Sequence, residues 1–415
     1  MLVAVASLPS PHILHAPPLR RGGGRASRLR SRVATPIGLP GHVEPGIGMT
    51  AHQRRSLRSL RRSLRGGALP RTRPDRTLRA RLALRRWGPT PAGACQATAA
   101  CDPDRVAIAD GHREVTFADV HRRTDALACA LAEQGVRAHH KVAIVCRNHH
   151  LLVETEIACS KLGTSVVHLD TAPGGMPLSQ ALRRLEPRLV VYDQEFSRAL
   201  GPQLPGTDRL LAWHDRDRQP CDPLLEDLIA ESATHGLKRV PDSGSRTVTL
   251  GARSGPAGWS GCTVAGSLLI PGTARSAVPL HPRETTMICA PLSSQWGHLH
   301  LTLALRLAST VVLRRDFDAL ETLAAIERRR VNAVALLPEM LEAIVGLSRE
   351  TLAWYDTGSL RVIAVRGQRV PGKLALPAIA HFGAVLYSRH GPSIVTLGPE
   401  LAQPLLGFNA SVKAA

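Results

Sequence analysis

The sequence predicts an α/β protein built on parallel, doubly wound sheets. Short runs of β-branched and aliphatic residues, such as KVAIV and RLVVYD, alternate with amphipathic stretches of helical length. This alternation is typical of βα units that build a parallel sheet. The chain has 415 residues, of which 44% are hydrophobic, so it is long enough for roughly two or three domains with buried cores. Only 3% of the residues are aromatic, so the cores must consist mainly of Leu, Val, Ala and Ile.

A first α/β unit is predicted over residues 89–245. Its opening stretch, residues 105–136, reads as a strand, a turn at Asp110, a second strand and a long helix. Thr116 is expected to cap that helix together with Asp119, three residues further on. Further strands are expected at 141–148, 165–170 and 188–193, with helices up to Leu162 and at 178–187.

A second α/β unit is predicted over residues 246–398. A polar region rich in Pro and Asp, residues 201–245, is expected to link it to the first unit. The same alternation of strand and helix then resumes. The strands are expected at 247–250, 285–292, 309–315, 331–338 and 360–367, and a helix at 317–330.

Most of the net charge belongs to an N-terminal tail. The chain carries +20, and residues 1–88 contain 19 arginines against Glu44 and Asp75, which gives 19 − 2 = +17 and leaves 20 − 17 = +3 for the rest. We therefore expect residues 1–88 to be a basic, disordered extension. Residues 54–67 could form a basic amphipathic helix that contacts a membrane surface or nucleic acid, or one that is simply solvated. The sequence therefore predicts that the protein has no specific nucleic-acid partner. Peripheral contact of this tail with a membrane surface stays open.

Cysteine and histidine usage indicates neither a disulfide framework nor a metal site. The eight cysteines form no CxxC pair, which favours buried thiols in a reducing cytoplasm. No apolar run approaches the roughly 18 residues that span a bilayer. Histidines cluster at 139–140, at 149–150 and at His298 and His300, but they form no recognisable zinc-binding pattern along the chain. They are expected to be surface or packing residues.

A glycine-rich stretch suggests a phosphate-binding loop. It reads TVTLGARSGPAGWSGC, a β-branched run followed by glycines, a proline and small residues. Glycines let successive backbone N–H groups approach phosphate oxygens. The stretch contains no lysine and no acidic residue, and Gly and Pro alone would also suit a simple connecting turn.

The order of these segments resembles the AMP-forming acyl-CoA synthetases, the adenylate-forming fatty-acid–CoA ligases. The stretches that carry the resemblance are DPDRVAIADGHREVTFADVHRRTDALACALAEQGV, KVAIVCRNHHLLVETEIACSKLGTSVVHLD, FDALETLAAIERRRVNAVALLPEMLEAIV and YDTGSLRVIAVRG. The resemblance implies the N-terminal domain of such a ligase, with two doubly wound subdomains. It also implies that residues 399–415 begin a small β-barrel subdomain, so that the chain is truncated before the family's C-terminal domain.

The resemblance implies a reaction and its cofactors. Family members activate a fatty acid with ATP to an acyl-adenylate, which then reacts with coenzyme A; the expected ligands are therefore ATP or AMP, CoA, Mg²⁺ and a fatty acid. At the family's phosphate loop the lysine position is Ala257, and at its Tyr-Gly-Ser-Thr-Glu motif the Mg²⁺-binding glutamate position is Ile394. The nucleotide-binding positions implied by the two motifs and a neighbouring loop are Thr249, Gly251, Arg253, Ser254, Gly258, Gly367, His390, Gly391 and Ser393.

The acyl side of the site is altered as well. The family's Pro-Leu-Phe-His motif reads PLSS, which places Ser294 at the histidine position and retains Gly297. We therefore expect impaired activity, no retained catalytic residue and no metal ligand. The alternatives are a catalytically silent protein that binds an acyl chain or adenylate, or pairs with a full-length paralogue, and a truncated gene product without function.

Overall fold

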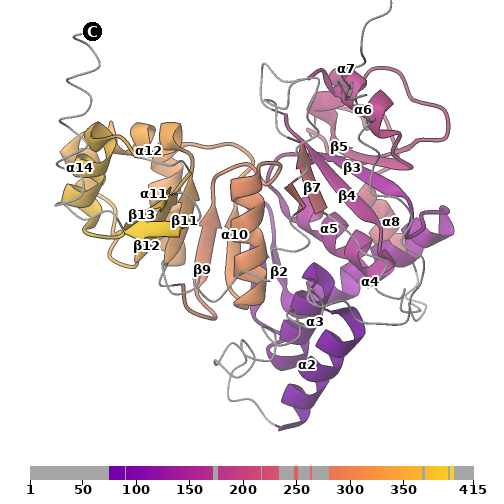
Figure 1. Cartoon of the computed structure of the whole chain (residues 1–415), viewed down its shortest axis with the longest axis horizontal. Helices are drawn as coiled ribbons and strands as arrows, with labels where there is room; N and C mark the ends of the chain where they lie inside the picture. Colours follow the sequence, from indigo (N-terminus) through magenta and orange to yellow (C-terminus); the bar gives the residue numbers. More distant parts are fainter. Residues whose placement is uncertain are drawn as a thin grey trace, which may run out of the picture. The chain divides into compact units, whose positions relative to one another are not determined.

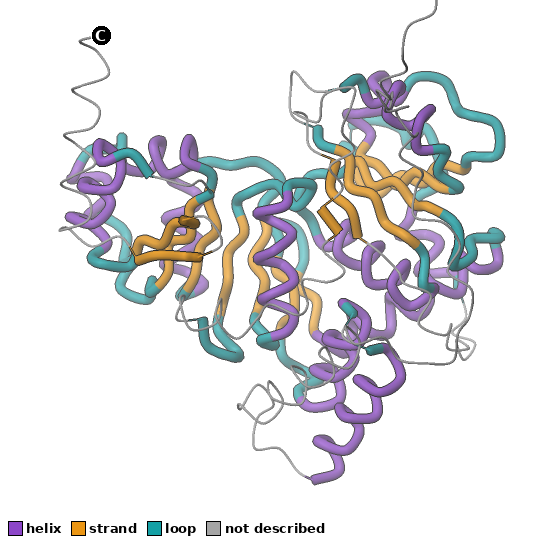
Figure 2. The backbone as a smooth tube through the Cα atoms, viewed as in Figure 1, coloured by secondary structure: helices purple, strands orange, loops and turns teal. Residues whose placement is uncertain are grey.

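The computed structural model describes residues 74–88, 90–171, 176–215, 217–232, 247–250, 262–263, 280–366, 370–390 and 393–396. For 247–250, 262–263, 389–390 and 393–396 it describes the backbone alone. All of these residues lie in one compact unit, Thr50–Ala415. Figure 2 shows strands gathered in two sheets with helices beside them, which confirms the α/β class expected from the sequence.

The smaller sheet has six strands in the order β6-β5-β3-β4-β7-β8. Figure 1 labels β3, β4, β5 and β7 of this sheet. Neighbours from β6 to β7 run parallel, and β8 returns antiparallel to β7. Its strands are β3 (Lys141–Val145), β4 (Ser165–Leu169), β5 (Leu189–Asp193), β6 (Asp208–Trp213), β7 (Thr247–Leu250) and β8 (Cys262–Thr263). The helices in this part of the sequence are α4 (Phe117–Glu133), α5 (His150–Leu162), α6 (Leu178–Leu185), α7 (Ser197–Leu200) and α8 (Leu225–Glu231), with a 3-10 turn η1 (Gln194–Phe196).

The larger sheet has eight strands in the order β14-β13-β12-β11-β9-β10-β1-β2. Its six inner strands are parallel, and β14 and β2 pair antiparallel at the two edges. Its strands are β1 (Val106–Ala109), β2 (Glu114–Thr116), β9 (Thr285–Ile288), β10 (Thr310–Leu313), β11 (Ala333–Leu336), β12 (Val362–Val365), β13 (Leu386–His390) and β14 (Ser393–Thr396). The helices that alternate with them are α10 (Gln295–Arg306), α11 (Ala319–Arg329), α12 (Pro338–Val345), α13 (Arg349–Ala353) and α14 (Gly372–Phe382).

Each sheet takes strands from both halves of the sequence. Strands β1 and β2 come from the first predicted unit but belong to the larger sheet, while β7 and β8 come from the second and complete the smaller sheet. The boundary expected near residue 245 therefore does not separate the two sheets, because each sheet contains strands from both sides of it.

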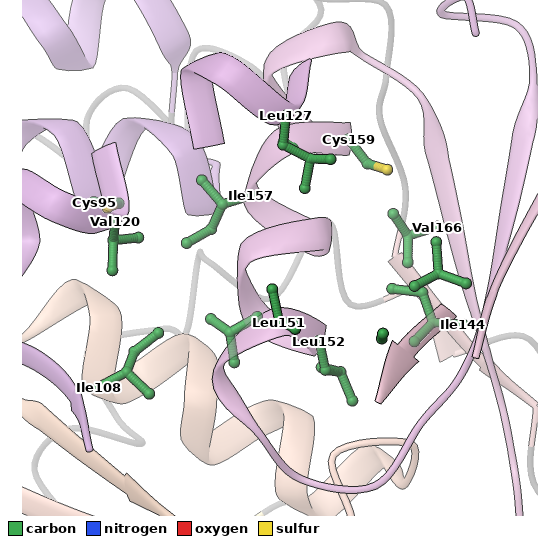
Figure 3. Close-up of a cluster of buried hydrophobic side chains, with 14 of the residues drawn as sticks. Cys95, Ile108, Val120, Leu127, Ile144, Leu151, Leu152, Ile157, Cys159 and Val166 are labelled. Carbon is green, nitrogen blue, oxygen red and sulfur yellow. The ribbon is translucent and has the colours of Figure 1, made fainter. Parts of the chain in front are cut away.

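The main hydrophobic core joins elements of both sheets. Leu127 of α4, Ile157 of α5 and Ile144 of β3 pack in one cluster with Ile108 of β1 (Figure 3). These four side chains are at most 1% exposed. Helix α4 begins as the sequence predicts, because the Thr116 hydroxyl accepts the Asp119 N–H at 3.1 Å. The aliphatic composition thus builds the core with few aromatic rings.

The disorder expected for residues 1–88 does not hold for residues 74–87, and the polar linking region contains regular structure. The last part of the basic extension forms helix α2 (Pro74–Trp87), because Ala80, Ala83 and Trp87 are buried along one face against α3 (Pro91–Cys101). The polar region after residue 200 contributes strand β6 and helix α8, because Leu210 and Leu211 are buried in the smaller sheet. Among the described residues, every helix is too short or too polar to cross a bilayer.

Candidate functional site

The predicted phosphate loop begins where β7 ends. Thr249 lies in β7, paired with His168 of β4 on one side and Cys262 of β8 on the other. The loop residues Gly251, Arg253, Ser254 and Gly258, and Ala257 with them, lie outside the described residues, between two antiparallel strands. In doubly wound sheets, ligands bind outside the carboxyl ends of the strands. The expected strand and its position are therefore confirmed, and the roles of the loop residues stay predictions.

The second predicted motif lies at the end of the larger sheet. Strands β13 and β14 pair antiparallel, with His390 opposite Ser393 and Arg389 opposite Ile394. Gly391, which connects the two strands, and Gly367, which follows β12, are outside the described residues. The backbone register thus places His390 and Ser393 beside each other at the carboxyl end of β13, which fits the predicted nucleotide-binding role without testing it.

Ser294 and Gly297 have clear structural roles at the start of α10. The Ser294 hydroxyl accepts the Gly297 N–H at 3.1 Å and donates to the Pro291 carbonyl at 2.6 Å, so it caps the helix. A Cβ at Gly297 would lie 2.3 Å from the Pro291 oxygen and 2.7 Å from the Ala290 oxygen. The close approach of helix and turn therefore explains both residues, and their predicted place in an acyl pocket stays a prediction.

A polar cleft lies where the carboxyl ends of strands from both sheets meet. It has a volume of about 420 Å³. Residues that follow β1, β3, β5 and β10 line it together with the end of β6, and they are Gly111, His112, Arg147, Gln194, Glu195, Trp213, His214, Asp215, Arg314, Arg315 and Asp316. The guanidinium of Arg315 lies 4.4 Å from the centre of the Trp213 ring.

Most of the charged side chains that line this cleft form ion pairs. Arg315 contacts Asp193 and Glu195, each at 2.7 Å. Arg147 contacts Glu195 at 2.7 Å and Asp316 at 2.9 Å. Because each guanidinium is already paired with carboxylates, the cleft is better explained as a junction that joins the two sheets than as a site selective for anions.

Asp193 is the buried centre of that junction. Burial alone would raise the pKa of its carboxyl, but the charges of His149 and Arg315, with hydrogen bonds from His149 and the Arg147 backbone, hold the pKa below its usual range. Its Oδ1 lies 2.9 Å from Nε2 of His149, which is fully buried. Sequence reasoning did not single out Asp193, although its position at the end of the strand RLVVYD places it at the edge where ligands of such sheets bind.

Three of the clustered histidines make contacts within the protein core. His149 and His150 bind Asp193 and Asp110, and Nδ1 of His300 donates to the Trp296 carbonyl at 2.9 Å, so all three make contacts typical of packing residues. Two contacts of these histidines are not visible in their spacing along the chain. The fold brings together two buried groups that could hold a metal ion, Cys146-His149-Asp193 and Glu156-His168-His298.

Comparison with known proteins identifies the family. Residues 95–245 and 265–395 match the AMP-binding enzyme family. The chain is 29% identical over 283 residues to a feruloyl-CoA synthase from Amycolatopsis sp, with 66% of this chain and 53% of the relative covered. It is 27% identical to enterobactin synthase component E from Escherichia coli, with 69% and 55% covered. The chain therefore spans little more than half the length of these curated relatives.

Solved structures agree on the fold. An anthranilate CoA ligase in complex with anthranoyl-AMP is 18% identical with a TM-score of 0.61, and the match covers 72% of this chain and 59% of that one. A putative long-chain-fatty-acid CoA ligase from Rhodopseudomonas palustris is 19% identical with a TM-score of 0.62, covering 74% and 77%. Taken with the matched residues, these similarities establish that the chain belongs to the AMP-binding enzyme family, the adenylate-forming acyl- and aryl-CoA ligases.

Proposed function

We propose that this chain binds a carboxylic acid and an adenine nucleotide as its family does, but forms the acyl-adenylate very slowly. The observation that carries the proposal is the loss of charge at two positions. Ala257 stands where the family's phosphate loop has a lysine, and Ile394, on β14, stands where the family has a glutamate. The retained glycine pattern and the pairing of His390 with Ser393 support residual nucleotide contact.

Physical chemistry gives each loss a consequence. A lysine at the loop supplies charge and hydrogen-bond donors where negative charge develops during transfer, and removal of one such preorganised donor typically lowers the rate about a hundred- to thousandfold. Mg²⁺ requires oxygen ligands, so a hydrocarbon at Ile394 does not fit the metal that the family implies. The slow step is expected to be adenylation itself, with binding less affected.

The substrate class is proposed from resemblance. The sequence resemblance favours fatty acids, while relatives bear the names feruloyl-CoA synthase, indoleacetate–CoA ligase and 2-succinylbenzoate–CoA ligase. We therefore propose an apolar carboxylic acid, with fatty acids first and aryl acids second.

The test is ATP–pyrophosphate exchange with a panel of fatty and aryl acids. We expect exchange near background for the natural chain and a gain of about a hundred- to thousandfold in Ala257→Lys. Ile394→Glu should also raise exchange, and the double variant should gain most. Ala265→Lys is the control for adding a lysine at another position of the same sequence region, and Val395→Glu places a carboxylate at the next position along β14, where side chains alternate between the two faces of a strand. Neither variant should restore exchange.

Three results would count against the proposal. Rapid exchange by the natural chain would refute slow adenylation. A double variant that neither exchanges nor binds ATP, as measured by calorimetry, would refute the retained nucleotide site. Equal rescue by the control variants would show that added charge, and not its position, matters.

A further inference from the structure

A buried group of three ligating side chains lies outside the predicted nucleotide site. Glu156 belongs to α5, His168 to β4 and His298 to α10. All three are at most 2% exposed. Helix α10 packs on β9 and β10 of the larger sheet, whereas β4 belongs to the smaller one, so the group joins the two sheets.

One possible ligand atom from each of the three residues lies close to those of the other two. Nε2 of His298 lies 2.7 Å from Oε1 of Glu156, and Nε2 of His168 lies 3.4 Å from Oε2 of the same carboxylate. One ligand atom from each residue lies within 4.8 Å of the others. The two imidazole rings are 5.5 Å apart at their centres.

His168 is poorly satisfied by the protein alone. Its side chain is fully buried, and among the described residues neither ring nitrogen has a hydrogen-bond partner within the geometric limits of a hydrogen bond. The Glu156 carboxylate oxygen beside Nε2 is 3.4 Å away. A neutral imidazole carries one N–H, and a buried donor without an acceptor is destabilising. An unsatisfied buried group in a native protein calls for an ion or a water to complete it.

The other group that could hold a metal, Cys146, His149 and Asp193, contains no such unsatisfied imidazole. His149 donates through Nε2 to Asp193 at 2.9 Å and accepts the Leu152 N–H through Nδ1. The Cys146 thiol donates to the Val191 carbonyl, and burial raises its pKa well above the usual range. A thiol must lose its proton to bind a metal, and the raised pKa of Cys146 opposes that loss. The hydrogen bonds of His149 and Cys146 also satisfy this group without an ion.

We propose that Glu156, His168 and His298 form a binding site for one divalent transition-metal ion, with Zn²⁺ as the best match. Two imidazoles and one carboxylate are an established three-ligand zinc set, with bonds of about 2.0–2.2 Å. Each Nε2 atom lies beside one oxygen of the Glu156 carboxylate, at 2.7 and 3.4 Å, so an ion bound there would take one ligand from each residue. Nitrogen ligands also distinguish this site from one for Mg²⁺, which takes oxygen.

The surroundings set the expected strength of binding. Nδ1 of His168 and Nδ1 of His298 have no hydrogen-bond partner among the described side chains and backbone. Zinc-bound histidines usually donate that N–H to an outer acceptor, and loss of this support weakens metal binding about 10- to 100-fold. The site should therefore bind Zn²⁺ more weakly than a fully supported site of the same ligands.

The experiment measures metal content and stability in the full-length chain. Metal content is determined by mass spectrometry after purification without chelator. Replacement of Zn²⁺ by Co²⁺ reports metal coordination through visible d–d absorption. Urea unfolding in the presence of Zn²⁺ or of a chelator reports the effect of the metal on stability. The test variants are His168→Leu and His298→Leu. The matched controls are His300→Leu, a buried histidine of the same helix α10, and Cys146→Ser, which disables the second group.

We expect about one metal ion per chain in the natural protein and both controls, and none in the two test variants. Zn²⁺ at about a hundred times its dissociation constant should shift the unfolding equilibrium about a hundredfold in the natural protein and not in His168→Leu. Without metal, His168→Leu should be at least as stable as the natural chain, because it removes an unsatisfied buried imidazole.

Other outcomes overturn the proposal. A natural chain that holds no metal and whose stability responds to neither Zn²⁺ nor chelator indicates a buried water in place of an ion. Metal that persists in His168→Leu, or that disappears in Cys146→Ser, places the ion elsewhere. Should both leucine variants fail to fold, Glu156→Gln keeps the side-chain volume; unchanged Zn²⁺ affinity in that variant would equally refute the site.

Discussion

Replacing Arg123 by methionine is expected to destabilise the protein by about 3–5 kcal/mol. Arg123 lies in α4, is 5% exposed, and forms two hydrogen bonds of 2.8 Å with Glu154 of α5, which is 0% exposed. It also binds Glu226 of α8 at 2.7 and 2.9 Å. Methionine keeps much of the side-chain volume but leaves the Glu154 carboxylate buried without its cation, and an uncompensated buried charge is the source of the expected loss.

Urea unfolding followed by circular dichroism at pH 7 measures this change as a shift in midpoint at constant slope. Arg122→Met is the matched control, because the neighbouring Arg122 is 69% exposed and pairs with Asp119 at 2.9 Å; we expect a change of at most about 1 kcal/mol. The double variant Arg123→Met with Glu154→Leu should recover most of the stability, since it removes the unpaired charge as well. A loss below about 1 kcal/mol in Arg123→Met, or no recovery in the double variant, would refute this reasoning.

Three further substitutions test α10. Ser294→Ala removes the helix cap and should cost about 1 kcal/mol in urea unfolding, and a loss near zero would mean that the cap is dispensable. Gly297→Ala places a methyl group against the Pro291 oxygen and should cost about 1–3 kcal/mol; an unchanged midpoint would contradict the close approach. Burial lowers the pKa of His300 to about 4 despite its hydrogen bond to Trp296. The unfolded chain therefore takes up the proton first as pH falls, and about 2 kcal/mol of stability should be lost between pH 7 and 5 through this residue. His300→Leu should remove that part of the loss, and identical pH profiles for the two proteins would count against it.

Most regular elements could be predicted because they have a local pattern. The strand at Lys141–Val145 and the helix at His150–Leu162 carry their hydrophobic periodicity within a few residues. Helix α3 was not predicted, because PAGACQATAAC has small residues on every side and shows little periodicity. Helix α2 was misjudged because its arginines dominate the composition, while only Ala80, Ala83 and Trp87 reveal its buried face.

The candidate site could be predicted only where a motif is contiguous. Thr249 and His390 could be proposed as site residues because each belongs to a short pattern along the chain. The group of Glu156, His168 and His298 comes from three separate elements, and tertiary packing alone brings those residues together. No spacing rule along one sequence contains that information.

The exchange of strands between the sheets affects how the chain must fold. A fragment that ended near residue 245 would lack β7, leaving the edge of β4 uncovered, and its β1–β2 hairpin would have no β10 to join. Exposed edges of this kind favour intermolecular pairing and aggregation. Both fragments would be incomplete alone, so proteolysis in the region that joins them should yield pieces that stay associated. Each sheet is completed by strands that are far apart in the sequence. Pairing such strands closes long loops, and the entropy lost in closing them slows folding.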